Sequence, residues 1–490
     1  MLANLTRVVY EPRLRALFDR WYFWGILAVA AVLRLWNLGY PRALVFDETY
    51  YVKDALTLSM TGVERNWPDN ANAAFEAGQY SGYLDTGSFV VHPPLGKWII
   101  AAGMWLFGPG NPMGWRFSVA VLSIGAVALL MMLMRKLTES TVWSALAGFL
   151  FAIDGLSIVM GRTGLLDGIL MFFVLLAFWF LVLDRERDFG AIWQRPWLIA
   201  AGIALGAATA VKWSGLYFLA AVGIYVVVSE LDFIDGELDL LLLTKQAVAK
   251  FVMLVPTAFV VYLLSWTGWF NTSEGYDRNW AEQAGNAWTG ILAWVPTSLQ
   301  SLWHYHVEAY NFHVGLRTPH SYQSNPLTWL FLTRPTSFFY QGYDNGANGC
   351  AVESGCSSAI TALGNPVIWL PALAAVLFLI YLFISRRDKA AGFILLGVAA
   401  GYLPWMLYLQ RTVFQFYVIA FEPFMVIALV YAMAWIWRNV SAERKKLLVA
   451  GFATLVFAAL AFSLFFLNIW LGTWTPYWYW YLHMWIPSWI

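Results

Sequence analysis

Long apolar runs separated by short polar segments dominate the pattern of this chain. A helix that crosses the hydrocarbon core of a bilayer needs roughly 20 mainly apolar residues. We predict such helices at 21–40, 116–134, 142–160, 165–183, 197–213, 215–230, 248–267, 366–385, 391–409, 413–437 and 447–470. The fifth and sixth are short and meet at residues 212–215. The pattern therefore predicts an all-α polytopic membrane protein with about 11 transmembrane helices.

The composition supports a bilayer as the main solvent. Hydrophobic residues make up 60% of the chain and charged residues 12%, whereas a soluble domain has about 25% charged residues. The 29 Trp, 24 Tyr and 35 Phe residues suit aromatic belts at two membrane interfaces. A net charge of +1 gives no general attraction for nucleic acid. No Walker motif or GxGxxG sequence opens a helix, which argues against a nucleotide-binding domain.

Basic residues in the short loops predict the orientation, because cytoplasmic loops carry an excess of Lys and Arg. One set of loops is rich in them, including 135–136, 386–387 and 444–446. The short loops of the other set hold only Arg162, Lys212 and Arg411. This bias places the N-terminus in the cytoplasm and the C-terminus outside, for a multi-pass protein of the plasma membrane.

We expect residues 1–490 to form one membrane domain with two large extracytoplasmic segments. The first, 41–115, contains an acidic motif and interfacial helices; its apolar run 98–107 is too short to span. The second, 268–365, contains Cys350 and Cys356. Two cysteines six residues apart in an oxidising compartment suggest a small disulfide loop, although two free thiols remain an alternative.

The first candidate for chemistry is the adjacent pair Asp47 and Glu48, within residues 46–51 (FDETYY). Carboxylates near hydrocarbon are costly to hold, so they are functional suspects. A structural explanation competes with this one, because Asp47 could cap a helix running from residue 48 to 59.

Cations on the same side could bind an anion. Lys97 follows His92 and two prolines in 91–97 (VHPPLGK) and begins the interfacial run, where it could meet a phosphate or simply snorkel. Arg162 and Asp167 share a tight outer turn and could pair with each other or reach the same cavity as Asp47. Arg411 lies on another short outer turn, which suggests a phosphate or carboxylate partner.

The late outer segment is rich in histidine. His304 and Glu308 are four residues apart, which would form half of a metal site on one helix face. A complete ligand set is not visible, so we assign no metal and leave metal dependence open. Aromatic residues interleaved with His and Asn suit a sugar or peptide surface better, which makes His304, His306 and His320 candidates for acceptor binding.

The motifs in this order resemble the protein O-mannosyltransferases over nearly the whole chain. The similar segments are 46–51 (FDETYY), 91–97 (VHPPLGK), Arg162 with 165–167 (LLD), and 334–340 (RPTSFFY). The tail 483–489 (HMWIPSW) resembles the actinobacterial branch. Each motif is weak alone, but the ordered set is specific. Eukaryotic members carry a MIR domain in the late loop, and 268–365 is too short to hold one.

The resemblance implies a GT-C membrane fold and an inverting mannosyltransferase without a cofactor. Its donor would be polyprenyl-phosphate-mannose, and its acceptors Ser or Thr hydroxyls of secreted or membrane proteins, including chains that emerge from the translocon. It implies Asp47 as the base and Glu48 as a supporting group. With the cations above it suggests that Lys97, Arg162 and Arg411 hold the donor phosphate, beside His92 and Asp167.

Two other functions remain open at this point. A GT-C transferase could instead modify a lipid or a cell-wall glycan, as arabinose and aminoarabinose transferases do. A secondary transporter would place ionisable residues near the midplane and often shows internal repeats. The sequence favours it less, because most ionisable residues lie in outer loops or at outer helix ends.

Overall fold

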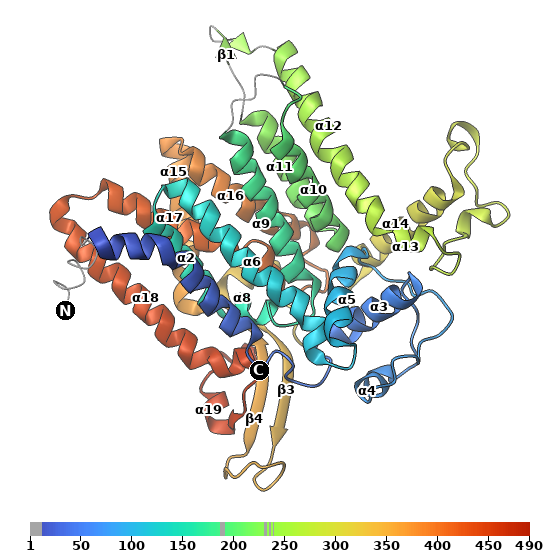
Figure 1. Ribbon diagram of the computed structural model, residues 1–490, viewed down its shortest axis with the longest axis horizontal. Coiled ribbons are helices and arrows are strands. Elements are labelled where there is room, and N and C mark those ends of the chain that lie inside the picture. The colour runs from blue at the N-terminus through green and yellow to red at the C-terminus, as the bar shows by residue number, and fades with distance from the viewer. Residues whose placement is uncertain (1–11, 187–191, 230–232, 235–236, 239) are drawn as a thin grey trace.

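The computed structural model describes residues 12–186, 192–229, 233–234, 237–238 and 240–490, and its core is a bundle of long helices (Figure 1). The bundle helices are α2 (Pro12–Leu35), α6 (Pro112–Thr138), α7 (Thr141–Ile153), α8 (Gly155–Met160), α9 (Leu166–Arg185), α10 (Pro196–Val211), α11 (Gly215–Val228), α12 (Leu240–Ser265), α15 (Pro366–Arg386), α16 (Lys389–Tyr402), α17 (Glu422–Asn439) and α18 (Ala442–Leu471). Each predicted span contains a helix. Within the described residues, 7 helices are long and apolar enough to cross a membrane, so the multi-pass prediction is confirmed. The predicted cytoplasmic N-terminus concerns residues 1–11, which lie outside the described part.

Two predicted spans are interrupted. Span 142–160 breaks at Asp154, whose carboxylate accepts a hydrogen bond from the Leu156 amide at 2.8 Å and so begins the new helix α8. Span 413–437 begins with the 3-10 helix η5 (Gln415–Ala420), and α17 starts only at Glu422. Both breaks place polar backbone and buried carboxylates inside the bundle, where neighbouring helices surround them.

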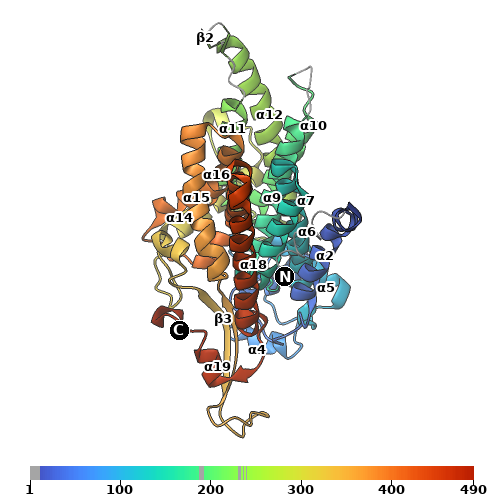
Figure 2. The same ribbon diagram turned by 90° about the vertical axis from the view of Figure 1, so that its left-hand side faces the viewer.

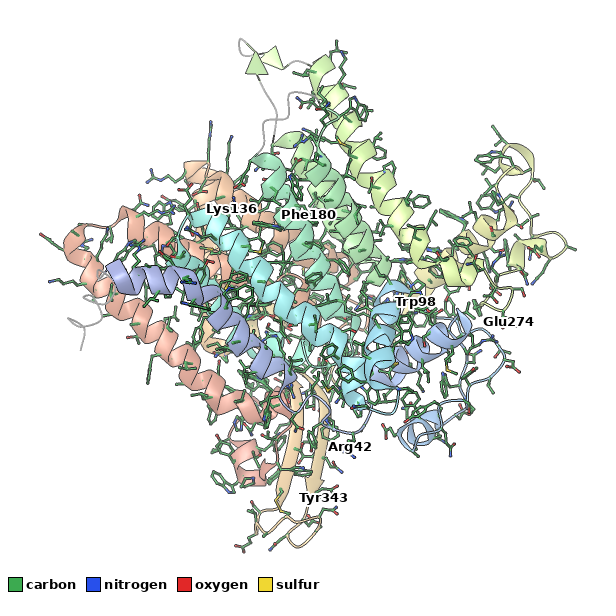
Figure 3. All side chains as sticks on the ribbon, in the orientation of Figure 1. Arg42, Trp98, Lys136, Phe180, Glu274 and Tyr343 are labelled. Atoms are coloured by element: carbon green, nitrogen blue, oxygen red, sulfur yellow. A yellow bond between two sulfur atoms is a disulfide. The ribbon has the colours of Figure 1, made fainter. Side chains whose placement is uncertain are left out.

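Several helices predicted to lie outside are found at one end of the bundle (Figure 1). Figures 1 and 2 show α3 (Glu48–Thr61), α4 (Ala71–Glu76), α5 (Leu95–Phe107) and α19 (Tyr477–Tyr481) there, and the short β1–β2 pair (Phe233–Ile234, Glu237–Leu238) at the other end. Figure 3 likewise shows Lys136 at the opposite end of the bundle from Arg42 and Tyr343. This separation agrees with the two sides predicted from the loop charges.

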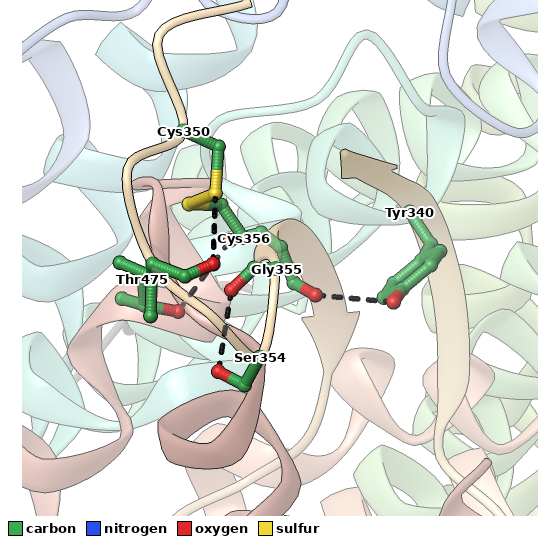
Figure 4. Close-up of a disulfide and its surroundings, with 8 residues drawn as sticks. Tyr340, Cys350, Ser354, Gly355, Cys356 and Thr475 are labelled. Carbon is green, nitrogen blue, oxygen red and sulfur yellow. Dashed lines mark hydrogen bonds between the residues drawn. A yellow bond between two sulfur atoms is a disulfide. The ribbon is translucent and has the colours of Figure 1, made fainter. Parts of the chain in front are cut away.

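A small sheet departs from the all-α prediction. Strand β3 (Thr336–Tyr343) pairs antiparallel with β4 (Cys356–Ala362), which pairs in turn with β5 (Thr475–Pro476) near the C-terminus. A glycine-rich connection joins β3 to β4, and its Cys350 forms a disulfide with Cys356, the first residue of β4 (Figure 4). Residues 336–339 of β3 are buried or half-buried, whereas residues 340–343 are half-buried or exposed, so the strand runs from the body of the protein toward solvent.

Close backbone contacts set the positions of the helices that carry the site. A side chain at Gly206 of α10 would meet the Ala258 backbone of α12 at 2.6 Å, so this small residue lets the two helices approach closely. A side chain at Gly268 would likewise collide with the Gly62 carbonyl at 2.0 Å. Gly268 lies in α13 (Thr267–Phe270), so the end of α3 is held against the segment that follows α12.

Candidate active site

Asp47 stands at the start of α3 but does not cap it. Phe46, with a φ of 48°, turns the chain immediately before it, and the Asp47 side chain makes no capping hydrogen bond. Among the described residues its carboxylate receives one long hydrogen bond, from Tyr51 Oη at 3.5 Å. Burial raises the pKa of the Asp47 carboxyl to about 6, while the nearby Lys212 ammonium opposes this shift. An ionised carboxylate without a capping partner is suited to accept a proton.

Glu48 has the opposite environment. Its side chain is fully buried and forms a two-point ion pair with Arg116, at 2.8 and 2.7 Å. It also accepts hydrogen bonds from the amides of Gly164 at 2.7 Å and Val45 at 3.0 Å. These contacts tie α3 to α6 and to the turn before α9, so Glu48 is placed to steady the loop that presents Asp47.

Lys212 is the residue that sequence reasoning missed. It ends α10 and donates hydrogen bonds to both carboxylate oxygens of Asp167, at 2.9 and 3.0 Å. Its ammonium lies 4.1 Å from the centre of the Tyr417 ring. The signal in the sequence was a lysine at the junction of two short apolar helices on the side that is otherwise poor in basic residues.

Lys212 and Arg411 line one cavity of about 200 Å³ beside this ion pair. The cavity is bounded further by His92, Trp213, Ser214, Leu216, Tyr217, Tyr310, His313, Val314, Trp405 and Tyr408. Arg411 donates from Nη2 to His313 Nδ1 at 3.0 Å, and its buried Nε has no hydrogen-bond partner in the described part of the chain. Two cations with spare donors and several aromatic rings make this cavity suited to an anionic head group.

His313 holds Arg411 in place. Its Nε2 lies 2.8 Å from the Val91 carbonyl and must donate to it, which leaves Nδ1 to accept from Arg411. Burial lowers the pKa of His313 to about 4, and the positive charges of Arg411 and Lys212 act in the same direction. His313 is therefore neutral at physiological pH, and the two cations remain the positive charges of the cavity.

An apolar cavity of about 560 Å³ adjoins the first between α10, α11, α12 and α14 (Thr297–Gly315). The two cavities share Trp213, Leu216 and Tyr310. Its remaining walls are almost entirely aliphatic and aromatic side chains of these four helices and the loop before α14. A charged chamber that continues into an apolar one matches the shape of a lipid with a phosphate head.

Two of the predicted phosphate ligands have other partners. Lys97 is buried, lies 2.5 Å from Glu64 Oε1, and donates to the His92 carbonyl at 3.0 Å. Arg162 donates to the carbonyls of residues 33, 34, 36 and 37 at the end of α2. Arg162 and Asp167 do not pair with each other, since Asp167 binds Lys212. These contacts give Lys97 and Arg162 structural partners, and their part in phosphate binding stays a prediction.

The predicted acceptor histidines do not converge on one point. His304 stacks on Trp280, 4.0 Å between ring centres, beside Asp277 at 3.3 Å. His306 lines the apolar cavity, and its ring stacks on Trp213. His320 packs edge-on against Phe46, next to Asp47 in the chain. Only His320 is thus placed near the acidic motif.

The remaining predictions concern His92 and metals. His92 lines the cation cavity, and its buried Nδ1 lacks a hydrogen-bond partner among the described residues. In that same part of the chain, no group of three or more His, Cys, Asp or Glu side chains could hold a metal ion. Among the described residues, the pair of His304 and Glu308 is therefore not completed to a metal site by a third ligand.

Comparison with known proteins decides the family. The model of the dolichyl-phosphate-mannose-protein mannosyltransferases matches residues 108–274, and that of the C-terminal four-helix membrane region of protein O-mannosyltransferases matches 298–489. The polyprenol-phosphate-mannose–protein mannosyltransferase of Mycolicibacterium smegmatis is 34% identical over 456 residues, covering 86% of this chain and 83% of that protein. This chain belongs to the protein O-mannosyltransferase family.

Other comparisons agree with this membership. The Corynebacterium glutamicum polyprenol-phosphate-mannose–protein mannosyltransferase is 30% identical over 509 residues, covering 96% of this chain and 93% of that protein. The yeast Pmt1–Pmt2 complex, solved with its sugar donor, shares the fold with a TM-score of 0.74 at 18% identity, over 100% of this chain and 94% of the yeast chain. ArnT from Cupriavidus metallidurans, bound to undecaprenyl phosphate, has a TM-score of 0.52 at 15% identity, over 94% and 72%. These likenesses confirm the GT-C fold that the motifs implied.

Proposed function

We propose that this protein O-mannosyltransferase moves mannose from polyprenyl-phosphate-mannose to Ser or Thr hydroxyls of exported proteins. The observation that carries the proposal is the position of Asp47. Its carboxylate does not cap α3, and the charges of Lys212 and Asp167 lie near enough to shift its pKa. Lys212 in turn lines the cation cavity. A base therefore stands beside a site suited to a phosphate, as transfer from a sugar phosphate requires.

The donor fits the two adjoining cavities in one orientation. Its phosphate would meet Arg411 and Lys212, where charge-assisted hydrogen bonds are strongest. Its prenyl chain would lie in the apolar cavity between α10, α11, α12 and α14. Mannose would then point toward Asp47. His92 and His313 line the same cavity, where His313 positions Arg411.

The reaction is a single displacement with inversion at the anomeric carbon. Asp47 takes the proton of the acceptor hydroxyl as the hydroxyl oxygen forms its bond to that carbon. The bond from the anomeric carbon to the phosphate oxygen breaks, and its electron pair leaves with polyprenyl phosphate. Arg411 and Lys212 stabilise the negative charge that grows on the phosphate. The leaving group is already an anion of low basicity, so no general acid is needed.

We further propose that the chemistry takes place at the outer face of the plasma membrane. Asp47 begins α3, and α3 and the β3–β4 hairpin lie at the end of the bundle whose short loops are poor in basic residues (Figure 1). The rule for loop charges places that end outside the cytoplasm. The C-terminus would lie there as well, and acceptors would be secreted or membrane proteins, including those leaving the translocon.

Membrane vesicles that contain the protein, given labelled polyprenyl-phosphate-mannose and a Ser/Thr-rich peptide, test the proposal. Label in the peptide, released by β-elimination as mannose, is the expected result. Label confined to lipid or glycan would instead assign the chain to transferases of the ArnT kind. Absence of any transfer, with intact donor bound, would overturn the proposed activity.

A further inference from the structure

The loop before α14 exposes large apolar side chains without any charge. Residues 283–303 contain no Asp, Glu, Lys or Arg. At the tip of the loop, Ile291 is 90% exposed and Trp294 is 78% exposed, and Leu292 between them is also exposed. Soluble surfaces seldom expose such a contiguous apolar group, which marks an interaction site.

Helix α14 continues this surface with three distinct faces. Leu302, Tyr305 and Ala309 are buried against the protein. A second stripe at helical spacing is apolar and exposed, and it consists of Trp303, Val307, Tyr310 and Val314. The third edge carries the polar residues His304, Glu308 and Asn311. A helix with one buried, one apolar and one polar face suits the boundary between lipid and water.

The apolar surface is continuous with the lipid-facing side of the bundle. The outward residues of α12 include the exposed Phe251, Phe259 and Leu264. In Figure 1 the chain between α13 and α14 projects sideways from the bundle, past α12. It lies at the same height as the bundle helices in this view. Trp288 and Val295 of this loop line the apolar cavity together with Phe259 of α12. Loop, helix and cavity therefore share one apolar side.

We propose that the loop 283–296 inserts into the outer leaflet of the bilayer and closes the lateral side of the apolar cavity against water. The partner is a lipid surface. The absence of charge over 283–303 fits hydrocarbon, and Trp294 and Trp303 are side chains that favour the interfacial region. Continuity with the exposed face of α12 places lipid, rather than a soluble partner, beside the tip.

Site-directed labelling of the full-length protein in phosphatidylglycerol–phosphatidylethanolamine vesicles tests this insertion. Cys350 and Cys356 are joined in a disulfide, so without reductant a maleimide fluorophore reacts only with an introduced cysteine. Ile291→Cys labels the tip, and Glu282→Cys labels an exposed residue at the base of the same loop. We expect nitroxide-bearing lipids to quench the label at Ile291→Cys several-fold more than at Glu282→Cys, and a water-soluble quencher to show the reverse order.

A second variant tests the cause of insertion. Here the label is attached at Thr289→Cys, and Ile291→Asp and Trp294→Asp are added to the same protein. We expect quenching by nitroxide lipids to fall to the level seen for Glu282→Cys, because burying an ionised side chain in hydrocarbon is costly. If the two aspartate changes leave nitroxide-lipid quenching of the Thr289→Cys label unchanged, the proposal is overturned. It is likewise overturned by equal quenching at Ile291→Cys and Glu282→Cys, which indicates a loop in water. Protection of Ile291→Cys from both quenchers would indicate a protein partner, such as a second copy, and would also overturn it.

Discussion

Lys212 donates to both carboxylate oxygens of Asp167, at 2.9 and 3.0 Å, across the junction between α10 and α9. This ion pair fixes the lysine ammonium at the edge of the cation cavity, with the Tyr417 ring against it at 4.1 Å. It also sets the electrostatics around Asp47, because Lys212 favours the ionised form of that carboxyl and Asp167 disfavours it. Base and phosphate site are thus coupled through one lysine.

The first prediction concerns Asp47 itself. Asp47→Asn should insert and fold normally but lose about 10²–10⁴-fold in transfer rate, the usual effect of removing a positioned base. Radiolabel transfer to peptide in vesicles measures this loss. Asp54→Asn, on the same face of α3, is the matched control and should retain far more activity. Comparable rates for Asp47→Asn and the unaltered protein would exclude the base assignment.

The pH dependence follows from the same carboxyl group. Burial raises its pKa to about 6, and the reaction needs the ionised form. We therefore expect kcat/KM to be flat above that pH and to fall about tenfold per unit below it. In Lys212→Met the favourable charge is removed, so the pKa of Asp47 should rise and the acid limb should move to higher pH. A limb that moves to lower pH, or stays in place, would contradict the coupling.

The third prediction concerns Arg411, whose buried Nε lacks a partner among the described residues. Arg411→Ala should raise the donor KM and lower kcat, since it removes a charge-assisted contact to the phosphate worth about 1.5–3 kcal/mol. Arg411→Lys keeps the charge but loses the fork that also reaches His313, so it should recover only part of the activity. Steady-state kinetics at varied donor concentration distinguish the two variants. A normal donor KM in Arg411→Ala would show that the phosphate binds elsewhere.

The hydrophobic pattern was enough to predict the bundle, because each apolar run of spanning length can satisfy its backbone only as a helix. It could not predict the break at Asp154, where one buried carboxylate starts a new helix. It also missed the pairing of β4 with β5, since those strands lie more than one hundred residues apart in the chain. Periodicity records local burial and carries no information about such distant partners.

The sequence indicated which residues could belong to the candidate site better than it indicated which side chains they contact. Asp47 and Arg411 came from their depth and from the motif. Lys212 was counted only as an outer-loop lysine, because its pairing with Asp167 joins helices that sequence reasoning cannot dock. Lys97 was predicted from its motif without its partner, since Glu64 lies on a loop whose position only the fold reveals.

Glu48 and Arg116 give the fourth prediction. Their pair is buried, with the Arg116 side chain also donating to the carbonyls of Leu38, Pro41 and Ala43. Glu48→Gln should destabilise the protein by about 3–5 kcal/mol, because it leaves a buried guanidinium without its counter-charge. Thermal unfolding in detergent measures this loss. Glu48→Gln should lower the melting temperature far more than Asp47→Asn, whereas equal melting temperatures would argue that Glu48 acts in the reaction instead.

The last prediction separates scaffold cations from phosphate cations. Arg162 is 6% exposed and donates only to carbonyls at the end of α2 among the described residues, so its charge stabilises a helix C-terminus. Arg162→Gln should therefore lower the melting temperature yet leave the donor KM of the folded fraction unchanged. Arg411→Gln should do the reverse, with a raised donor KM and a nearly normal melting temperature. Donor kinetics and thermal unfolding measured on the same two preparations test both halves, and a raised donor KM in Arg162→Gln would return that arginine to the phosphate site.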